Sequence, residues 1–389
     1  MSSSLPHPEV LIVGGGVMGA STAWHLANRG CRDVLVLDHG PEPGAGSTGR
    51  ATGGFRTQFA TEINIRLSLL SREKLLRFPE EVGADPGYRP SGYLFLAADD
   101  TQLETLRALR PLQRSLGVEV EEIGPEDIRR LNPAVEIGEI PGGTFGPEDG
   151  FIRPMDILRG YTDAAQRLGV RFEYGVDVLS VEVEGNRAVG VRTARETIVA
   201  GHVVNAAGAW AAGLARTAGV EIPVAPVRRQ VAPTEPTDLL PEDMPMTIFL
   251  EDGFHLRVRD GRVLLLWPEE TPSSDPFDTS FDPRWLDGLI KRAHARVPRL
   301  REARLDRDRC WAGLYEMTPD HHAILGPVPG IEGLWLLTGS SGHGVMHSPA
   351  LGHLAAELVL DGTARSMDIQ PLRPTRFAEG APNKEVSLL

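Results

Sequence analysis

The feature that most constrains this chain is a glycine-rich turn that joins an apolar strand pattern to a helical pattern near the N-terminus. The segment reads EVLIVGGGVMGASTAWHLANRGCRDVLVLDHG, and it predicts a strand at 10–13, an alanine-rich helix and a second strand at 34–37. Such a βαβ unit is typical of a parallel sheet covered by helices. The sequence therefore predicts an α/β fold.

The spacing of three glycines in this turn indicates a ligand. Gly14 permits the tight turn, Gly16 lets the backbone approach a pyrophosphate, and Gly19 lets the helix pack close to the strand. A pyrophosphate held there lies at the positive end of the helix, beside Val17 and Met18. A glycine turn that serves only packing is the alternative. Because strand, turn and helix are in register with an acid at the end of the second strand, we predict a dinucleotide site.

The residues after the second strand favour a flavin over a nicotinamide. Asp38 ends that strand, where a carboxylate can accept hydrogen bonds from ribose hydroxyls, and His39 follows it. An NAD-binding domain normally continues with another apolar strand, whereas this chain continues with a small-residue loop, 44–54, and a helical pattern from about Glu62. Loop amides and hydroxyls suit a second phosphate or an isoalloxazine ring. The residues expected to contact the cofactor from this loop are Ser47, Thr48, Arg50 and Gly53.

Composition limits the possible partners. The net charge of −13 over 389 residues argues against a nucleic acid or an anionic membrane surface. We find no apolar run that approaches the ~18 residues of a membrane span, and the opening MSSSLPHP lacks the pattern of a signal peptide. Cys31 and Cys310 are too few for a disulfide framework or a zinc site. We expect a cytoplasmic protein without a metal that acts on a small molecule.

Two later segments have clear local patterns. In TGSSGHGVMHSPALG, 338–352, a glycine-rich loop precedes a helix that we expect to have Ser348 at its N-cap, Pro349 at its first position and Gly362 as its stop.

The other segment, GFHLRVRDGRVLLLW, has a two-residue hairpin turn at Asp260–Gly261, which places His255 opposite Leu266 and Arg257 opposite Leu264. The face that these four residues share is mixed in polarity, as in a binding cavity. We predict that Arg257, with His255 beside it, receives a substrate carboxylate; a solvated sheet face is the alternative.

The order of motifs along the chain resembles that of the D-amino-acid oxidase and sarcosine oxidase superfamily. After the βαβ unit these motifs are STGRATGGFR, VVNAAGAW, WAGLYEMTPDHHAILGP and SSGHG. The chain is most similar to the sarcosine/dimethylglycine oxidase and dehydrogenase branch, which includes beta-subunit-like flavoproteins. The resemblance implies a Rossmann-like FAD-binding domain of the glutathione-reductase type, and an α+β second domain whose antiparallel β-sheet roofs the flavin. The expected segments are 1–80, 150–222 and 313–378 for the FAD-binding domain, 81–149 and 223–312 for the substrate-binding domain, and 379–389 for a C-terminal tail.

The same resemblance implies further site residues. The loop before the last helix approaches the N1 and C2 carbonyl end of the flavin in such proteins, so its amides and the helix dipole are expected to stabilise the reduced ring. Tyr315 matches an aromatic position of the family's substrate cavity, and Arg56, after the second glycine cluster, is a further carboxylate or flavin-proximal candidate. The remaining expected cofactor contacts are Val178, Ala207, Gly208, Gly342, His343, Gly344, Val345 and Met346.

Three positions depart from the family pattern. Gly313 stands where monomeric sarcosine oxidases tether the flavin through a cysteine, and Arg50 stands where dimethylglycine dehydrogenases use a histidine. We therefore expect non-covalent FAD. Met346 stands where the monomeric oxidases place a lysine over the flavin, so oxygen or an electron carrier is left open as the acceptor.

The expected function is oxidation of the C–N bond of a small amino acid or N-methylated amine of the sarcosine, dimethylglycine, proline or D-amino-acid type. Hydride passes to flavin N5 and leaves an imine that water hydrolyses. A cationic site of Arg56, His255 and Arg257 is expected to lower the pKa of the bound amine. A partner subunit is possible. Two alternatives stay open: a flavin-binding assembly or interaction protein without amine turnover, and an NAD-linked dehydrogenase.

Overall fold

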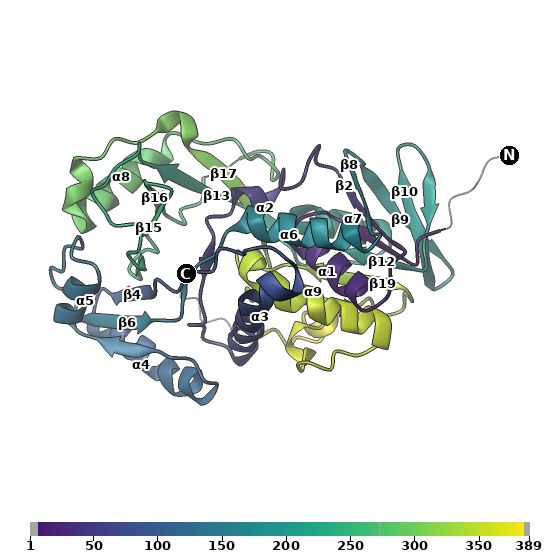
Figure 1. Ribbon diagram of the computed structural model, residues 1–389, viewed down its shortest axis with the longest axis horizontal. Helices are drawn as coiled ribbons and strands as arrows, with labels where there is room; N and C mark the ends of the chain where they lie inside the picture. The colour runs from purple at the N-terminus through teal and green to yellow at the C-terminus, as the bar shows by residue number, and fades with distance from the viewer. Residues whose placement is uncertain (1–6, 272, 385–389) are drawn as a thin grey trace.

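Two large sheets organise the computed structural model, which describes residues 7–271 and 273–384 (Figure 1). Residues 1–6 of the expected first segment and 385–389 of the expected tail lie outside the described residues. The first sheet has the strand order β18-β19-β12-β1-β2-β8 and is parallel except for β18. Its strands are β1 (Val10–Val13), β2 (Val34–Asp38), β8 (Arg171–Tyr174), β12 (His202–Asn205), β18 (Ile324–Pro327) and β19 (Leu334–Thr338).

Helices cover one face of this sheet, as its sequence pattern predicts, and a small three-stranded sheet packs on the other. All four residues of β1 are buried, because a parallel strand that is covered on both faces has no polar side. Helix α1 (Val17–Asn28) contacts α6 (Pro154–Arg167) and α9 (Gly344–Asp361), and α3 (Glu62–Glu81) contacts α9 (Figure 1). A Cβ on Gly352 of α9 would lie 2.2 Å from Ser21 Oγ, so α1 and α9 need a glycine at their contact.

The start of α9 differs from its prediction. The helix begins at Gly344 and contains Pro349, whereas the sequence pattern placed the N-cap at Ser348. Proline in a helix leaves the carbonyl four residues earlier without its donor, here that of Val345. The Ser348 hydroxyl donates to this carbonyl at 2.9 Å, which lets the helix run through the proline. The predicted stop at Gly362 is confirmed, since this residue has a left-handed conformation with φ 74°.

The second sheet has eight strands in the order β17-β13-β16-β15-β14-β4-β6-β5. It is antiparallel, as expected, except that β14 and β4 pair in parallel. The predicted hairpin register is confirmed, because His255 faces Leu266 and Arg257 faces Leu264. The strands are β4 (Tyr93–Ala97), β5 (Glu121–Ile123), β6 (Gly142–Gly146), β13 (Ala225–Pro233), β14 (Met246–Phe249), β15 (His255–Arg259), β16 (Arg262–Leu266) and β17 (Trp311–Met317).

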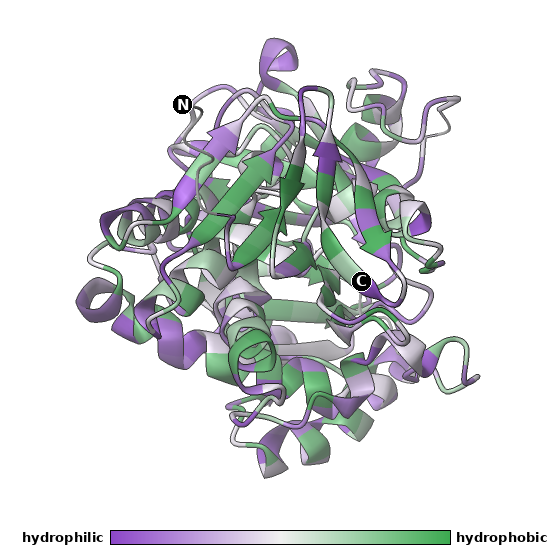
Figure 2. Ribbon diagram, turned by 90° about the vertical axis from the view of Figure 1, so that its right-hand side faces the viewer, coloured by the Kyte–Doolittle hydropathy of each residue, from purple (hydrophilic) through white to green (hydrophobic). Residues whose placement is uncertain are grey.

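Smaller elements complete the fold. Figure 2 shows hydrophobic residues concentrated on the strands that face the viewer, with hydrophilic residues toward the turns and outer helices. The remaining helices are α2 (Ser47–Arg50), α4 (Asp100–Ser115), α5 (Pro125–Leu131), α7 (Ala211–Thr217) and α8 (Trp285–Arg296), and the remaining strands are β3 (Gly54–Phe55), β7 (Gly150–Phe151), β9 (Val178–Glu184), β10 (Arg187–Thr193) and β11 (Thr197–Val199). Short 3-10 helices are η1 (Gly208–Trp210), η2 (Pro298–Arg301), η3 (Arg307–Arg309), η4 (Gln370–Leu372) and η5 (Pro374–Arg376).

The chain passes between the two sheets more than once. The domain boundaries themselves stay a prediction. None of the helices in the described part of the chain combines the length and hydropathy that a bilayer-spanning segment requires.

Candidate active site

A cavity of about 710 Å³ lies between the two sheets. Its volume falls in the range of cofactor and small-molecule sites. One wall consists of the glycine turn, the 46–54 loop, residues 206–210 and the start of α9. The other wall comes from six strands of the second sheet. Seven residues of this wall are called the roof residues: Tyr93, Arg229, Met246, Ile248, His255, Leu266 and Tyr315.

The glycine turn is shaped by close backbone contacts. Gly14 has φ 109°, and a Cβ there would lie 2.2 Å from the carbonyl oxygen of Ala206. A Cβ on Gly19 would lie 1.9 Å from the carbonyl oxygen of Gly14. Gly19 does not line the cavity, and its role is the close helix–strand contact that the sequence predicted.

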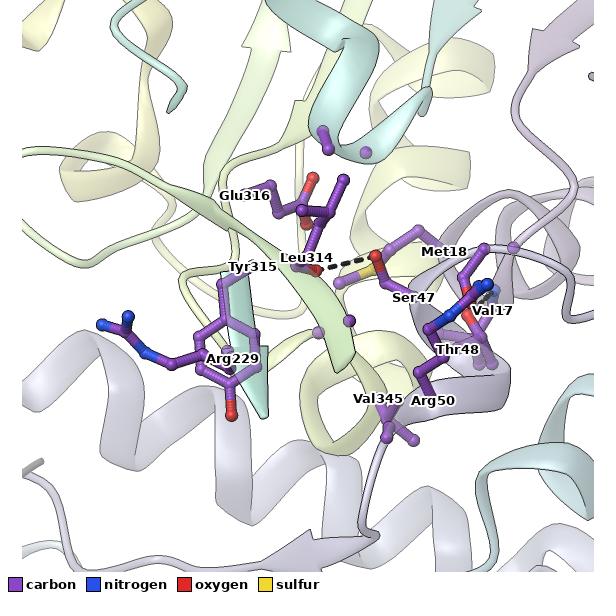
Figure 3. Close-up of a pocket in the computed structure, with 18 of the residues that line it drawn as sticks. Val17, Met18, Ser47, Thr48, Arg50, Arg229, Leu314, Tyr315, Glu316 and Val345 are labelled. Carbon is purple, nitrogen blue, oxygen red and sulfur yellow. Dashed lines mark hydrogen bonds between the residues drawn. The ribbon is translucent and has the colours of Figure 1, made fainter. Parts of the chain in front are cut away.

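Thr48 brings the second glycine loop to the first turn of α1. Its Oγ1 accepts a hydrogen bond from Val17 N at 3.1 Å, so the hydroxyl hydrogen stays available to a ligand. Ser47 Oγ donates to the carbonyl of Leu314 at 2.7 Å and joins this loop to β17 (Figure 3). The anion-binding end of the cavity is therefore assembled from two segments of the chain.

Asp38 lies at the other side of the turn. Its Oδ2 accepts from Gly15 N at 2.6 Å and its Oδ1 accepts from Gly40 N at 2.7 Å. Carboxylate oxygens retain lone pairs beyond these bonds, which suits the predicted contact with ribose hydroxyls. The neighbouring His39 packs edge-on against Trp210 at 4.5 Å between ring centroids, and both residues line the cavity.

The end of the loop before α9 and the first residues of this helix, 342–346 together, line the cavity. The first amides of a helix have no acceptor within the helix, and they lie at its positive end. Because α9 begins at Gly344, these amides belong to the cavity-lining residues themselves. Gly342, with φ 86°, leaves room for the ring of Tyr315, since a Cβ there would lie 2.4 Å from Tyr315 Cε2.

Arg56 places a buried positive charge on the cavity. It is 5% exposed, donates to the carbonyl of Gln58 at 3.0 Å, and lies 3.3 Å from Nε2 of His343. Its guanidinium carbon lies 4.1 Å from the centre of the Phe59 ring. Burial lowers the pKa of Arg56 to about 10, which still leaves it charged at neutral pH.

His343 is neutral beside this cation. Burial first, and then the charge of Arg56, hold the pKa of His343 well below its usual range. Because an arginine can only donate, Nε2 of His343 accepts and the ring hydrogen lies on Nδ1. In the described residues no carboxylate oxygen lies within the 4.0 Å of an ion pair with Arg56.

The roof carries a neutral histidine and a second arginine. Nδ1 of His255 lies 2.8 Å from the carbonyl of Gly253, which can only accept, so Nε2 is an unprotonated acceptor. Burial lowers the pKa of His255 to about 4. This corrects the expectation that His255 contributes positive charge. The guanidinium carbon of Arg229 lies 5.8 Å from the centre of the Tyr315 ring. Figure 3 shows the two side chains next to each other.

The structure also corrects the role expected for Arg257. Its side chain does not line the cavity, and it donates to the carbonyls of Thr52 at 2.8 Å and Gly53 at 3.0 Å. The predicted hairpin register is right, but alternate residues on one sheet face meet different neighbours. His255 lines the cavity, whereas Arg257, two residues on, lies against residues 52 and 53 of the loop.

The structure brings the other expected residues together. Those that line the cavity are Gly14, Gly16, Val17, Met18, Asp38, His39, Ser47, Thr48, Arg50, Gly53, Arg56, Val178, Ala207, Gly208, His255, Tyr315, Gly342, His343, Gly344, Val345 and Met346. Their individual roles stay predictions.

Sequence reasoning missed Glu316 and Arg229. Oε2 of Glu316 accepts from the Thr338 hydroxyl at 2.8 Å and Oε1 accepts from Ser340 N at 3.2 Å, so this carboxyl fixes the loop before α9. Burial raises its pKa. Its place within WAGLYEMTPD, next to Tyr315, was the available signal. Arg229 became a candidate only once β13 paired with β17.

Asp149 supports the Arg56 loop from behind. It is fully buried, its Oδ1 accepts from N and Oγ1 of Thr57, and its Oδ2 accepts from Nε2 of Gln58 at 3.0 Å. Burial raises the pKa of Asp149 to about 6. The folded protein therefore keeps a proton that the unfolded chain releases at about pH 4.

We expect Asp149 to reduce stability as the pH rises from about 4 to about 6, with no further change above that window. The D149N variant keeps an oxygen for Thr57 but has no proton to lose. Urea unfolding gives the free energy of unfolding of each protein. Between about pH 4 and pH 6, the difference in this free energy between wild type and D149N should change by of order 1 kcal/mol per pH unit. A difference that stays constant from pH 4 to 7 would contradict this.

Comparison with known proteins gives one family. The model of the family described as FAD dependent oxidoreductase matches residues 9–358. The dimethylglycine dehydrogenase of Mus musculus mitochondria is 29% identical over 95% of this chain and 44% of its own length, so the chain spans less than half of that relative.

Solved structures agree with this result. The L-proline dehydrogenase from P. horikoshii has a TM-score of 0.90 and 29% identity, over 97% of this chain and 100% of its own. The glycine oxidase from Geobacillus kaustophilus has a TM-score of 0.84 and 27% identity, over 95% of this chain and 99% of its own.

Proposed function

This chain belongs to the FAD-dependent oxidoreductase family, and from that premise we propose that it oxidises the C–N bond of a small amino acid with a secondary or tertiary amine. The family assignment covers amine and amino-acid oxidoreductases, which include relatives named for dimethylglycine and proline. The choice of substrate within that class is the proposal. It depends chiefly on one observation, the buried charge of Arg56 on the cavity.

The residues of the cavity fit FAD. The glycine turn and Thr48 suit the pyrophosphate, Asp38 suits the ribose, and the first turn of α9 suits the anionic edge of a reduced ring. A Cβ on Gly313 would lie 3.0 Å from Cβ of Arg50, so the two positions at which relatives attach the flavin face each other here. Neither residue has a side chain that forms such a bond, which supports non-covalent binding.

Arg56 supports a carboxylate on the substrate. A buried cation without a carboxylate partner is costly, and an anionic ligand removes that cost. At hydrogen-bond distance the described residues supply a carbonyl and a neutral histidine to Arg56, whereas the Asp149 carboxylate acts on its charge only from beyond ion-pair distance. We infer that the substrate carboxylate occupies this position and that Tyr315, at the other side of Gly342, limits the space beside it.

The same charge favours the reactive form of the amine. A nearby cation lowers the pKa of a bound ammonium, so that more of the amine is neutral at physiological pH. His255 Nε2, an acceptor on the roof, suits a hydrogen bond from a substrate N–H. Bound FAD would supply the two-electron acceptor for oxidation of the carbon beside this nitrogen. The chain's own task is to orient that carbon and to exclude water from it.

An anaerobic titration of the purified flavoprotein tests this function. Sarcosine, dimethylglycine, L-proline and D-amino acids are added in turn, and the visible flavin band is followed. We expect at least one N-substituted amino acid to bleach the band, and the rate at which air restores the colour then separates an oxidase from a dehydrogenase. A yellow protein that none of the compounds bleaches would contradict the proposal and favour a flavin-binding interaction protein.

A further inference from the structure

Side chains of the second sheet donate hydrogen bonds to the backbone carbonyls of residues 50–53, which we call the cofactor loop. Trp311 Nε1 donates to the first carbonyl, that of residue 50, at 2.8 Å. Arg259 donates to the carbonyls of residues 51 and 52 at 3.3 and 3.4 Å. Arg257 donates to those of residues 52 and 53 at 2.8 and 3.0 Å. Every carbonyl of the loop therefore faces a donor from the second sheet.

These donors lie behind the loop as seen from the cavity. Residues 50–54 line the cavity, whereas Trp311, Arg257 and Arg259 do not. In a planar trans peptide, the N–H points away from the carbonyl of the preceding residue. Carbonyls held toward the arginines therefore direct the amides of Thr52 and Gly53 away from them, to the side on which the cavity lies.

The two arginines bring charge as well as hydrogen bonds. Arg257 is 5% exposed and its guanidinium carbon lies 3.6 Å from the centre of the Phe151 ring, with no carboxylate oxygen at ion-pair distance in the described ranges. Burial, followed by the charge of Arg259, lowers the pKa of Arg257 to about 9. Neutral donors could hold a loop at less cost. A cation on a carbonyl also polarises the peptide, which strengthens its N–H as a donor.

We propose that Arg257 and Arg259 are positioning residues that direct the amides of Thr52 and Gly53 to the flavin ring and thereby raise its affinity for electrons. The inference deepens the proposed function and rests on it only in requiring the flavin ring to lie against this loop. It assigns to Arg257 a role behind the cofactor, in place of a direct contact with substrate.

The test is the two-electron reduction potential of the purified flavoprotein, measured by equilibration with a reference dye. In R257M and R259Q the reduced cofactor should be destabilised about tenfold or more, which is a shift of about 30 mV to a more negative potential. R257K, which retains the charge on a more compact head group without the planar guanidinium, should lie between wild type and R257M. R130Q, at an exposed arginine of α5, is the control and should keep the wild-type potential.

A second measurement keeps the test decisive. The dissociation constant for FAD is obtained by titrating the apoprotein, and far-UV circular dichroism reports folding. Arg259 is partly exposed, so we expect R259Q to disturb the fold less than R257M does. If R257M does not fold, the reduction potential of R259Q tests the proposal. A wild-type potential in R259Q and R257K, with FAD bound and the fold intact, would overturn the proposal. Neither measurement uses an amine, so a failure of the proposed substrate class is seen separately, in the bleaching experiment.

Discussion

Replacing Gly19 by alanine is expected to weaken FAD binding by roughly 100-fold or more. The added Cβ would lie 1.9 Å from the carbonyl oxygen of Gly14, which is backbone and cannot rotate aside. Relief of this contact requires α1 to move away from β1, at a cost of about 3 kcal/mol for overpacking, and tenfold in affinity corresponds to 1.4 kcal/mol. The N-terminal end of α1, which we expect to bind the pyrophosphate, would move with it.

Fluorescence titration of the apoprotein with FAD measures this effect. The G124A variant is the matched control, because a Cβ at Gly124 has nothing within 4 Å and this residue is remote from the cavity. Circular dichroism separates a lost site from a lost fold. An affinity of G19A within threefold of wild type would show that the turn does not set the position of the cofactor.

Replacing Arg56 by glutamine should raise the KM for the amino-acid substrate by about 10- to 100-fold. Hydrogen bonds to charged groups contribute about 1.5–3 kcal/mol, and the neutral amide retains a donor without the charge. The loss should depend on the substrate, because the methyl ester of the same amino acid has no carboxylate to lose. We therefore expect R56Q to change the KM for the ester much less.

Steady-state kinetics with acid and ester, as a pair, decide the role of Arg56. An equal loss for both compounds would assign Arg56 to the flavin or to the fold. A more alkaline pH optimum in R56Q is also expected, because the bound amine no longer has a cation beside it to lower its pKa.

The parts of the fold that were predictable from sequence depend on residues close together in the chain. The βαβ unit and the hairpin at Asp260–Gly261 are each specified by one short segment, and a two-residue turn fixes the register of both of its strands. The parallel pair of β4 and β14 joins segments far apart in the chain. No local pattern indicates such a partner.

In the candidate site, too, features set by one short segment were predictable and contacts between distant segments were not. Most of the residues expected at the cofactor do line the cavity, because they belong to motifs with their own backbone geometry. Arg257 was placed on the correct sheet face but given the wrong neighbour, since its contact with residues 52 and 53 depends on how the two sheets meet. The start of α9 was missed because Ser348 serves the carbonyl that Pro349 leaves without a donor, a compensation that capping rules do not include.

The order of strands in the first sheet has a consequence for synthesis on the ribosome. β1 pairs with β12, β12 pairs with β19, and α9 packs on α1, so β1 and α1 find these partners only after a long stretch of chain has been made. Roughly 330 residues separate β1 from α9, which at about 5–20 residues per second is a delay of roughly 20 to 70 s. A nascent chain that has made its glycine turn still lacks the α9 wall of the cavity. We therefore expect chains stalled before α9 to stay colourless.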